Sequence, residues 1–125
     1  DIGADDKESA ERRIEIGDLT VSFSRTDHPV ETLAMRFDHD GRSLGYSADT
    51  GPAWSLEALG PGLDLVLCEA TVPIEEEDTM QHLSARQAGV TARAVTVAPT
   101  PIFNPVDLPV PGPHWAMCYL VLVVS

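Results

Sequence analysis

The sequence predicts a layered α/β domain, and two observations lead to this prediction. Apolar residues alternate with polar ones along several short segments, which is the period of a β-strand with one buried face. Residues 84–87 read Ser-Ala-Arg-Gln, which has the form of a capping box at the start of a helix. Strand segments with helical segments between them indicate a sheet with helices packed against it.

Length and composition limit what this domain is. A chain of 125 residues with 43% hydrophobic residues is long enough for one modest core and too apolar for disorder throughout. Its 20 acidic and 8 basic residues give a net charge of −12, which argues against a nucleic-acid surface built by this segment alone.

Three features bear on the compartment. The cysteines, Cys68 and Cys118, form no Cys-x-x-Cys pair or disulfide framework, which indicates a reducing, cytoplasmic setting. The first ten residues are polar and acidic, unlike a signal peptide, and a starting Asp1 suggests a partial reading frame. The longest apolar run, residues 115–124, is too short to cross a bilayer as a helix, so we expect no membrane partner.

The first half of the chain reads as strands. Residues 1–13 are a polar entry segment. Residues 14–23 alternate on both sides of Gly17-Asp18, which predicts a hairpin or a kinked strand. Residues 30–37 alternate again, and a turn at residues 38–41 leads into a strand that ends at Asp49.

The second half alternates helical and strand patterns. A short helical stretch at residues 53–59 stops at the Gly-Pro-Gly of residues 60–62. Residues 63–68 form an apolar run typical of a strand buried on both faces. An acidic loop at residues 73–79 precedes the capping box, which opens a helix to about residue 94.

The end of the chain has a different composition. Residues 95–98 are a candidate strand start, but six of the ten prolines follow within fifteen residues. Each proline removes a backbone donor, which predicts an extended loop or a segment foreign to the fold. The apolar residues 115–124 are suited to an edge strand, and left unpaired they would aggregate.

Asp49 is the first candidate for a functional residue. It is a lone carboxylate at the end of an alternating run, directly before the turn at Gly51-Pro52. A carboxylate at the rim of a sheet, where other loops approach, is well placed to hold a cation. Asp is also a common turn residue that hydrogen-bonds its own backbone, and the residues alone leave both interpretations open.

Four motifs follow one another along the chain, and the first is the weakest. They are Thr26-Asp27-His28-Pro29-Val30, Tyr46-Ser47-Ala48-Asp49-Thr50-Gly51-Pro52, Cys68-Glu69-Ala70-Thr71 and His82-Leu83-Ser84-Ala85-Arg86-Gln87-Ala88-Gly89. In this order they resemble the second half of the metallo-β-lactamase fold superfamily, in particular its ribonuclease Z and phosphodiesterase branch. The resemblance implies a partial αββα sandwich over residues 14–94, with a mostly antiparallel sheet and two helices. Residues 1–13 and the tail at residues 95–125 depart from it.

The resemblance also implies roles for individual residues. Asp49 corresponds to an Asp that bridges two metal ions, usually zinc. His82 corresponds to a His near the scissile phosphate, which suits a proton donor, and Glu69 to the Glu that orients it. Without the resemblance, the residues favour a loop histidine or a helix-end cap at His82, and an ordinary loop carboxylate at Glu69. His28 matches a frequent family histidine or satisfies its own turn, and His39 is an exposed turn residue.

The chain also departs from the family pattern at most metal ligands. The His-x-His-x-Asp-His cluster of the first half is absent, and residues 95–99 stand where a final ligand His is expected. His114 lies too far along the chain to replace it. The favoured prediction is therefore a metal-dependent hydrolase of phosphodiester bonds, represented by an incomplete chain that needs a His-rich half to hold two Zn²⁺ ions.

Other functions remain open. The chain is alternatively a non-catalytic remnant or interaction module that lacks a complete metal site. A β-lactamase or thioesterase proper fits the motifs at Asp49 and His82 less well. The expected partners are a phosphoester substrate, such as a nucleotide or RNA, and a second copy of the chain, because half a sandwich exposes its apolar sheet face.

Overall fold

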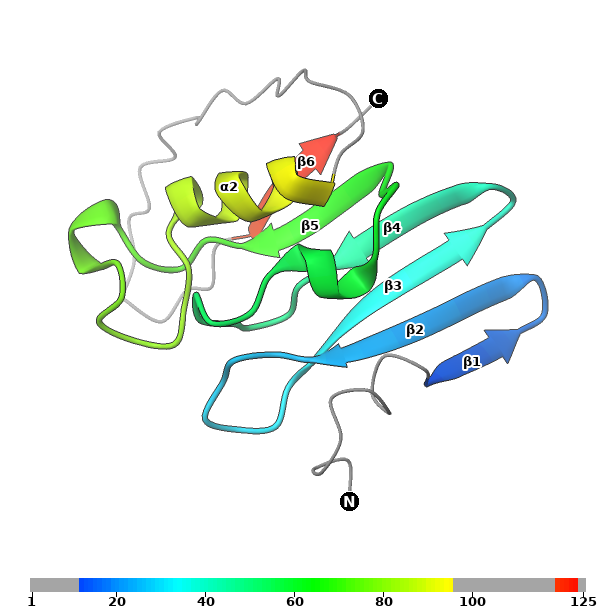
Figure 1. The fold of residues 1–125 in the computed structure, drawn as a ribbon, viewed down its shortest axis with the longest axis horizontal. Coiled ribbons are helices and arrows are strands. Elements are labelled where there is room, and N and C mark those ends of the chain that lie inside the picture. The colour runs from blue at the N-terminus through cyan, green and yellow to red at the C-terminus, as the bar shows by residue number, and fades with distance from the viewer. Residues whose placement is uncertain (1–11, 96–118, 124–125) are drawn as a thin grey trace.

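A computed structural model describes residues 12–95 and 119–123, and within these ranges the strands form one six-stranded sheet in the order β1-β2-β3-β4-β5-β6 (Figure 1). Pairing is antiparallel except between β4 and β5, which are parallel. The strands are β1 (Arg13–Ile16), β2 (Leu19–Arg25), β3 (Leu33–His39), β4 (Arg42–Tyr46), β5 (Leu65–Glu69) and β6 (Tyr119–Val123). The helices are the 3₁₀ turns η1 (Leu56–Leu59) and η2 (Ile74–Glu76) and the α-helix α2 (Ala85–Val95).

The hairpins follow from turn residues that tolerate a left-handed backbone. Gly17, with φ of 59°, joins β1 to β2, which confirms the predicted hairpin. Asp40 and Gly41, with φ of 49° and 74°, join β3 to β4. This turn is shorter than predicted because β3 continues through His39.

The strand predicted to end at Asp49 ends three residues earlier, at Tyr46, so that prediction is wrong. Ser47 accepts a hydrogen bond from the backbone N–H of Glu69 through its Oγ, at 2.9 Å, and donates to the carbonyl of Ala48 at 2.8 Å. Ala48 has φ of 51°, an uncommon conformation for a residue with a Cβ. The chain therefore leaves the strand direction before it reaches Asp49.

The first predicted helix is shorter than expected, and the second is confirmed. Only Leu56–Leu59 is helical within residues 53–59, as a 3₁₀ turn capped by Ser55 and stopped at Gly60. Ser84 and Gln87 form the reciprocal capping box, with N–O distances of 3.0 and 3.1 Å, at the start of α2. Because α2 continues through Val95, the prediction that a strand starts at Val95 is wrong. The other residues of that predicted strand, 96–98, lie outside the described ranges.

Strand β5 is buried mainly on one face, not on both as predicted. Val66 and Cys68 are fully buried, whereas Leu65 and Leu67 are half-buried. Burial raises the pKa of the Cys68 thiol to about 12, although a hydrogen bond with Ser47 acts to lower this pKa. Cys68 is a free cysteine, and Cys118 lies outside the described residues.

The tail contributes a strand to the sheet. Strand β6 pairs antiparallel with β5 and lies at the edge, so the predicted edge strand is confirmed over Tyr119–Val123. The rest of the predicted Pro-rich loop, and residues 1–11 of the entry segment, lie outside the described ranges. No helix in the described part of the chain has the length and apolarity needed to cross a membrane.

The hydrophobic core lies between α2, η1 and one face of the sheet (Figure 1). Helix α2 contributes side chains four and three residues apart, as an amphipathic helix does. Arg36 fixes η1 to β3, because its Nη1 donates to the carbonyls of Leu59 and Pro61 at 2.9 and 2.8 Å. The buried core residues are Ala34, Trp54, Leu56, Leu59, Leu63, Val66, Cys68, Leu83, Ala88, Ala92 and Val95.

The opposite face of the sheet is apolar across five strands. The pairing register places Ile14 beside Val21, Val21 beside Phe37 and Phe37 beside Leu44. Both α2 and η1 lie in front of the sheet in Figure 1, so neither covers this face. Its residues, most of them half-buried, are Ile14, Ile16, Leu19, Val21, Phe23, Leu33, Met35, Phe37, Leu44, Tyr46, Leu65 and Leu67, and we call them the rear face.

We predict that the rear face makes the chain associate. Ile14 and Ile16 are 51% and 62% exposed, and burying such surface against a second molecule is favourable. Size-exclusion chromatography with light scattering should show species larger than a monomer for the 125-residue chain.

The matched variants are Ile14→Lys with Ile16→Lys on the rear face, and Val90→Lys on α2, where Val90 is 60% exposed. The double variant should shift the chain towards monomer, and Val90→Lys should not. A monodisperse wild-type monomer that binds no hydrophobic dye would contradict this prediction.

Candidate metal centre

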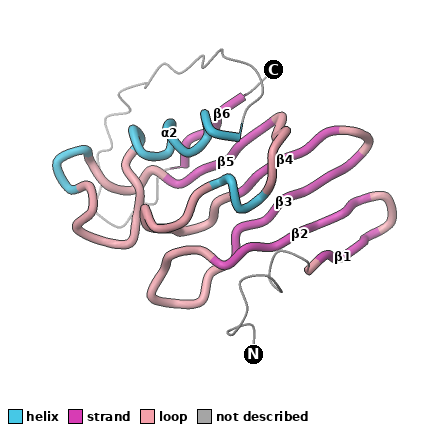
Figure 2. Tube along the Cα trace, in the orientation of Figure 1, coloured by secondary structure: helices cyan, strands magenta, loops and turns pink. Residues whose placement is uncertain are grey.

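The candidate site lies at one edge of the sheet, where the parallel strands β4 and β5 both end. Parallel strands bring their carboxyl ends to the same edge, and the loops that follow them commonly form ligand sites. The loops at residues 26–32, 47–53 and 70–84 gather at this edge, on the left of Figure 2. These three loops, together with Glu69 at the end of β5, carry the described residues that the sequence nominated for the site.

Asp49 is held by its backbone, and one oxygen of its carboxylate, Oδ1, has no partner among the described residues. Its carbonyl accepts a hydrogen bond of 2.6 Å from Thr26 Oγ1. Its Oδ1 is buried and accepts no hydrogen bond from any described residue, and the side chain as a whole is 24% exposed. A buried carboxylate oxygen without a donor is costly, so this atom fits a bound cation better than a turn-capping role.

Glu69, the last residue of β5, is fully buried and fully hydrogen-bonded. Oε1 accepts from the backbone N–H of Thr50 at 2.5 Å. Oε2 accepts from Thr71 Oγ1 at 2.7 Å and from the backbone N–H of Leu83 at 3.1 Å. These donors satisfy a carboxylate that is 0% exposed, and they join the loops after β4 and β5 to the start of α2.

His82 lies against this carboxylate, just before the helix. Its Nδ1 is 3.1 and 3.2 Å from the two oxygens of Glu69, and its side chain is 23% exposed. Because the carboxylate already accepts from Thr50 and Leu83, Nδ1 is the donor in this pair. Nε2 is then the atom that His82 presents outside the pair.

The other histidines differ in position. His28 Nε2 lies 4.0 Å from Asp49 Oδ2, and its ring meets the His82 ring edge-on, with centroids 5.5 Å apart. His28 Nδ1 also contacts the carbonyl of Val30 at 3.2 Å, which fits its predicted turn role, whereas its match to a family histidine remains a prediction. His39 is exposed at the end of β3, as predicted, and His114 lies outside the described residues.

Among the described residues, Asp49, Glu69 and His82 offer ligand atoms within 4.8 Å of one another. Proximity alone would make all three metal ligands. Glu69 is the exception on chemical grounds, because its oxygens already accept from two backbone N–H groups, a hydroxyl and an imidazole. The geometry therefore separates a carboxylate available to a cation, Asp49, from one that orients His82.

Sequence reasoning missed the role of Asp27. Its Oδ2 accepts from the backbone N–H of Ala53 at 3.1 Å, and its Oδ1 accepts from Gln81 Nε2 at 2.8 Å. Its carbonyl accepts from the N–H of Gly51 at 2.6 Å. Asp27 therefore connects the loop of Asp49 to the loop of His82, and its only sequence signal was the weak motif at residues 26–30.

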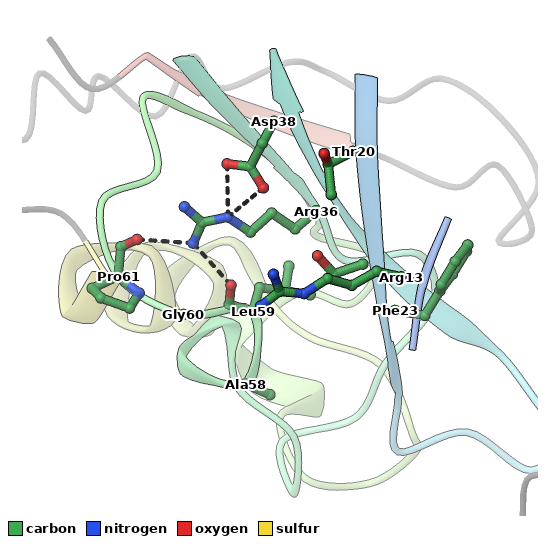
Figure 3. Close-up of a pocket in the computed structure, with 10 residues that line it drawn as sticks. Arg13, Thr20, Phe23, Arg36, Asp38, Ala58, Leu59, Gly60 and Pro61 are labelled. Carbon is green, nitrogen blue, oxygen red and sulfur yellow. Dashed lines mark hydrogen bonds and ion pairs between the residues drawn. The ribbon is translucent and has the colours of Figure 1, made fainter. Parts of the chain in front are cut away.

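A pocket of about 370 Å³ lies elsewhere, between η1 and the side of β1 to β3 that faces it (Figure 3). Arg36 lines this pocket, and its guanidinium already contacts Asp38, Ser43 and two backbone carbonyls. This arrangement holds η1 in place and contains none of the residues nominated for the metal site.

Comparison with known proteins identifies the fold. The chain resembles the metallo-β-lactamase fold protein YhfI of Bacillus subtilis, with a TM-score of 0.61 and 22% identity over 69% of this chain and 36% of that one. The described residues thus form part of a metallo-β-lactamase fold, which confirms the predicted fold class. The ribonuclease Z-like branch and the C-terminal position within the fold remain predictions.

Sequence comparison finds relatives as well, and one of them is again YhfI. An uncharacterized protein of Mycobacterium tuberculosis is 39% identical over 83 residues, and one of Mycobacterium leprae is 35% identical over 86 residues. These matches cover 63% and 67% of this chain but 30% of each relative. YhfI, described as a probable metallo-hydrolase, is 28% identical over 78 residues, or 62% of this chain and 32% of YhfI. No family model matches the chain.

We predict that Gly51→Ala destabilises the site loop. A Cβ at Gly51 would overlap Asp27 Oδ2 and lie 2.9 Å from Cα of Gln81. Such overpacking costs about 1–3 kcal/mol of unfolding free energy, measurable by urea denaturation.

The control is Gly89→Ala in α2, where an added Cβ meets nothing within 4 Å. It should be neutral or stabilise the chain by up to about 1 kcal/mol, since Ala is the better helix residue. Equal stabilities for the two variants would show that the loop of Asp49 is not packed as described.

Proposed function

We propose that this chain is part of a metal-dependent hydrolase of the metallo-β-lactamase superfamily, of the phosphodiesterase and ribonuclease Z-like type. The observation that carries the proposal is the buried, unpartnered Oδ1 of Asp49 beside the pair of Glu69 and His82. The likeness to YhfI, itself described as a probable metallo-hydrolase, supports the same class.

Asp49 is the residue that would hold the metal, proposed as two Zn²⁺ ions in the complete enzyme. Its two oxygens can contact two cations, whereas a zinc site needs three or four ligands. We propose that the others come from a His-rich segment that this chain does not contain. Zinc held there would lower the pKa of a coordinated water to about 7 and so would supply hydroxide at neutral pH.

The pair of Glu69 and His82 would manage the proton on the leaving group. Glu69 accepts a hydrogen bond from His82 Nδ1 and fixes the ring, which would leave Nε2 to face the reacting atoms. A proton carried at Nε2 can pass to the leaving oxygen as the phosphodiester bond breaks. The acidic loop and the net charge of −12 repel the phosphates of a substrate. The metals and His82 would therefore be the groups that contact those phosphates.

A non-catalytic interaction module is the second candidate, and the rear face is the observation that favours it. An exposed apolar sheet face is suited to pairing with another chain whether or not a metal is bound. The two functions differ in one measurable respect. An interaction module would still bind its partner after Asp49→Ala. It would also show no hydrolysis, even in a chain that carries the His-rich half.

We predict separate effects of two substitutions in the complete enzyme, meaning a chain that also carries the His-rich half. Asp49→Ala should lower metal content and turnover together, because it removes a ligand and its charge. His82→Ala should leave the metal content unchanged and slow hydrolysis about a hundredfold or more, as expected for a lost general acid.

The measurements are metal analysis by mass spectrometry and kinetics with a chromogenic phosphodiester. The 125-residue chain alone should bind zinc weakly and show no useful turnover. Two tightly held zinc ions in that short chain, or full metal and full activity in Asp49→Ala, would refute the proposed role of Asp49.

A further inference from the structure

The pocket between η1 and the sheet is lined on its sheet side by polar residues of three neighbouring strands (Figure 3). The pairing register sets Arg13 beside Ser22 and Ser22 beside Arg36, so these residues form one row across β1, β2 and β3. Thr20 lies beside Asp38 in the next row. Neighbouring strands are about 4.8 Å apart, so the side chains of both rows meet in one small area, on the side of the sheet opposite the rear face.

Arg13 gives this pocket a positive charge that no described residue neutralises. Arg36 is paired with the aspartate of the pocket, since its Nε lies 3.1 Å from both oxygens of Asp38. Arg13 is exposed and extends from β1 towards η1, and its guanidinium forms no salt bridge or hydrogen bond with a described residue (Figure 3). Two of the eight basic residues of a chain with a net charge of −12 therefore line one pocket, and one of them is unpaired.

Thr20 and Ser22 add two hydroxyl groups to the unpaired cation. Both residues are half-buried, and neither hydroxyl forms a hydrogen bond with a described residue. A hydroxyl group rotates to donate towards whatever acceptor lies near it. A guanidinium and hydroxyl groups are the donors that commonly bind the oxygens of a phosphate or a carboxylate. The free donors of the pocket therefore suit an oxyanion.

The opposite wall of the pocket is mostly apolar and consists of η1 and the turn after it, residues 58–61. Gly60 has φ of 86°, and a Cβ there would lie 3.1 Å from Nη1 of Arg36, so a larger residue would crowd this wall. The volume of about 370 Å³ is within the range of sites for small molecules. The pocket thus has room for an apolar body as well as an anionic group.

We propose that this pocket binds a small organic oxyanion, meaning a molecule that carries one phosphate or carboxylate group on a compact apolar body. The anionic group contacts Arg13 and the hydroxyls of Thr20 and Ser22, and the body lies against residues 58–61. None of these residues belongs to the candidate metal centre, so the inference does not depend on the proposed function.

The test titrates the full 125-residue chain with phenyl phosphate and with benzoate in metal-free buffer, followed by nuclear magnetic resonance. The Nε–H signal of Arg13 and the amide signals of Ser22 and Gly60 should shift with one or both anions. The amide signal of Asp49 should not shift, because Asp49 is outside the pocket. Phenol, the matched neutral probe, should leave all four signals in place, and added salt should weaken the binding of the anions.

Two variants locate the site. Arg13→Gln keeps a polar side chain but removes the charge, and it should weaken binding of the anion at least tenfold, as loss of a charged hydrogen bond does. The matched control is Arg25→Gln, because Arg25 is exposed at the end of β2 and does not line the pocket. It should leave the affinity unchanged. Ala58→Phe fills part of the pocket without altering its charge, and it should also weaken binding.

The outcomes decide the proposal without reference to metal or turnover. Weaker binding in Arg13→Gln and Ala58→Phe, with Arg25→Gln unchanged, supports the pocket, and the anion that shifts the signals identifies its class as phosphate or carboxylate. An equal loss in Arg13→Gln and Arg25→Gln shows unspecific attraction to surface charge and overturns it. Shifts at Asp49 in place of the pocket signals, or no shift with either anion, overturn it as well. The proposed hydrolase is left standing by all of these results.

Discussion

The buried carboxylate of Glu69 is the interaction on which the candidate site depends. It accepts hydrogen bonds from the loop after β4, through Thr50, and from the start of the α2 segment, through Leu83 and His82. These donors lie in segments that are separate in the sequence. The side chain of Glu69 therefore fixes the relative positions of β5, the loop after β4 and the start of the α2 segment. Removing it would leave two backbone N–H groups buried without an acceptor, a cost of about 1–3 kcal/mol for each group.

The connection between β4 and β5 explains why these segments meet. Parallel pairing requires the chain to cross over between the two strands, and the crossover here contains η1, which Arg36 and the core hold against the sheet. Both strands then end at the same edge. The left-handed Ala48 and the hydrogen bond between Thr26 and Asp49 aim the carboxylate of Asp49 into that edge.

The sequence predicted local features well and the geometry of the site only in part. The Gly17 hairpin, the Ser84 capping box and the stop at Gly60 depend on residues next to one another in the chain, and all three are confirmed. The end of β4 was predicted wrongly because the bond between Ser47 and Glu69 joins positions 22 residues apart. Nothing in the period of the strand encodes that bond.

Separation along the chain also explains which features of the site were predicted from the sequence and which were missed. The resemblance nominated Asp49, Glu69 and His82, and the structure brings them together, although it does not test their roles. The contact of Asp27 with Gln81 spans 54 positions, and the exclusion of Glu69 as a ligand depends on donors from three segments. A pattern search reads residue types, whereas the availability of a lone pair depends on what else contacts it.

The rear face and the candidate metal centre are built on the same two strands. The rear face belongs to the same strands, β4 and β5, that deliver Asp49 and Glu69 to the edge of the sheet. If the missing ligands are carried by a layer that covers the rear face, covering that face and completing the site are one event. Metal binding would then stabilise the packing of that layer by the free energy of ligation, and burial of the apolar face would raise the affinity for metal by the same amount. Under the proposed function, the weak zinc binding expected of this chain and the exposure of its rear face would therefore have one cause.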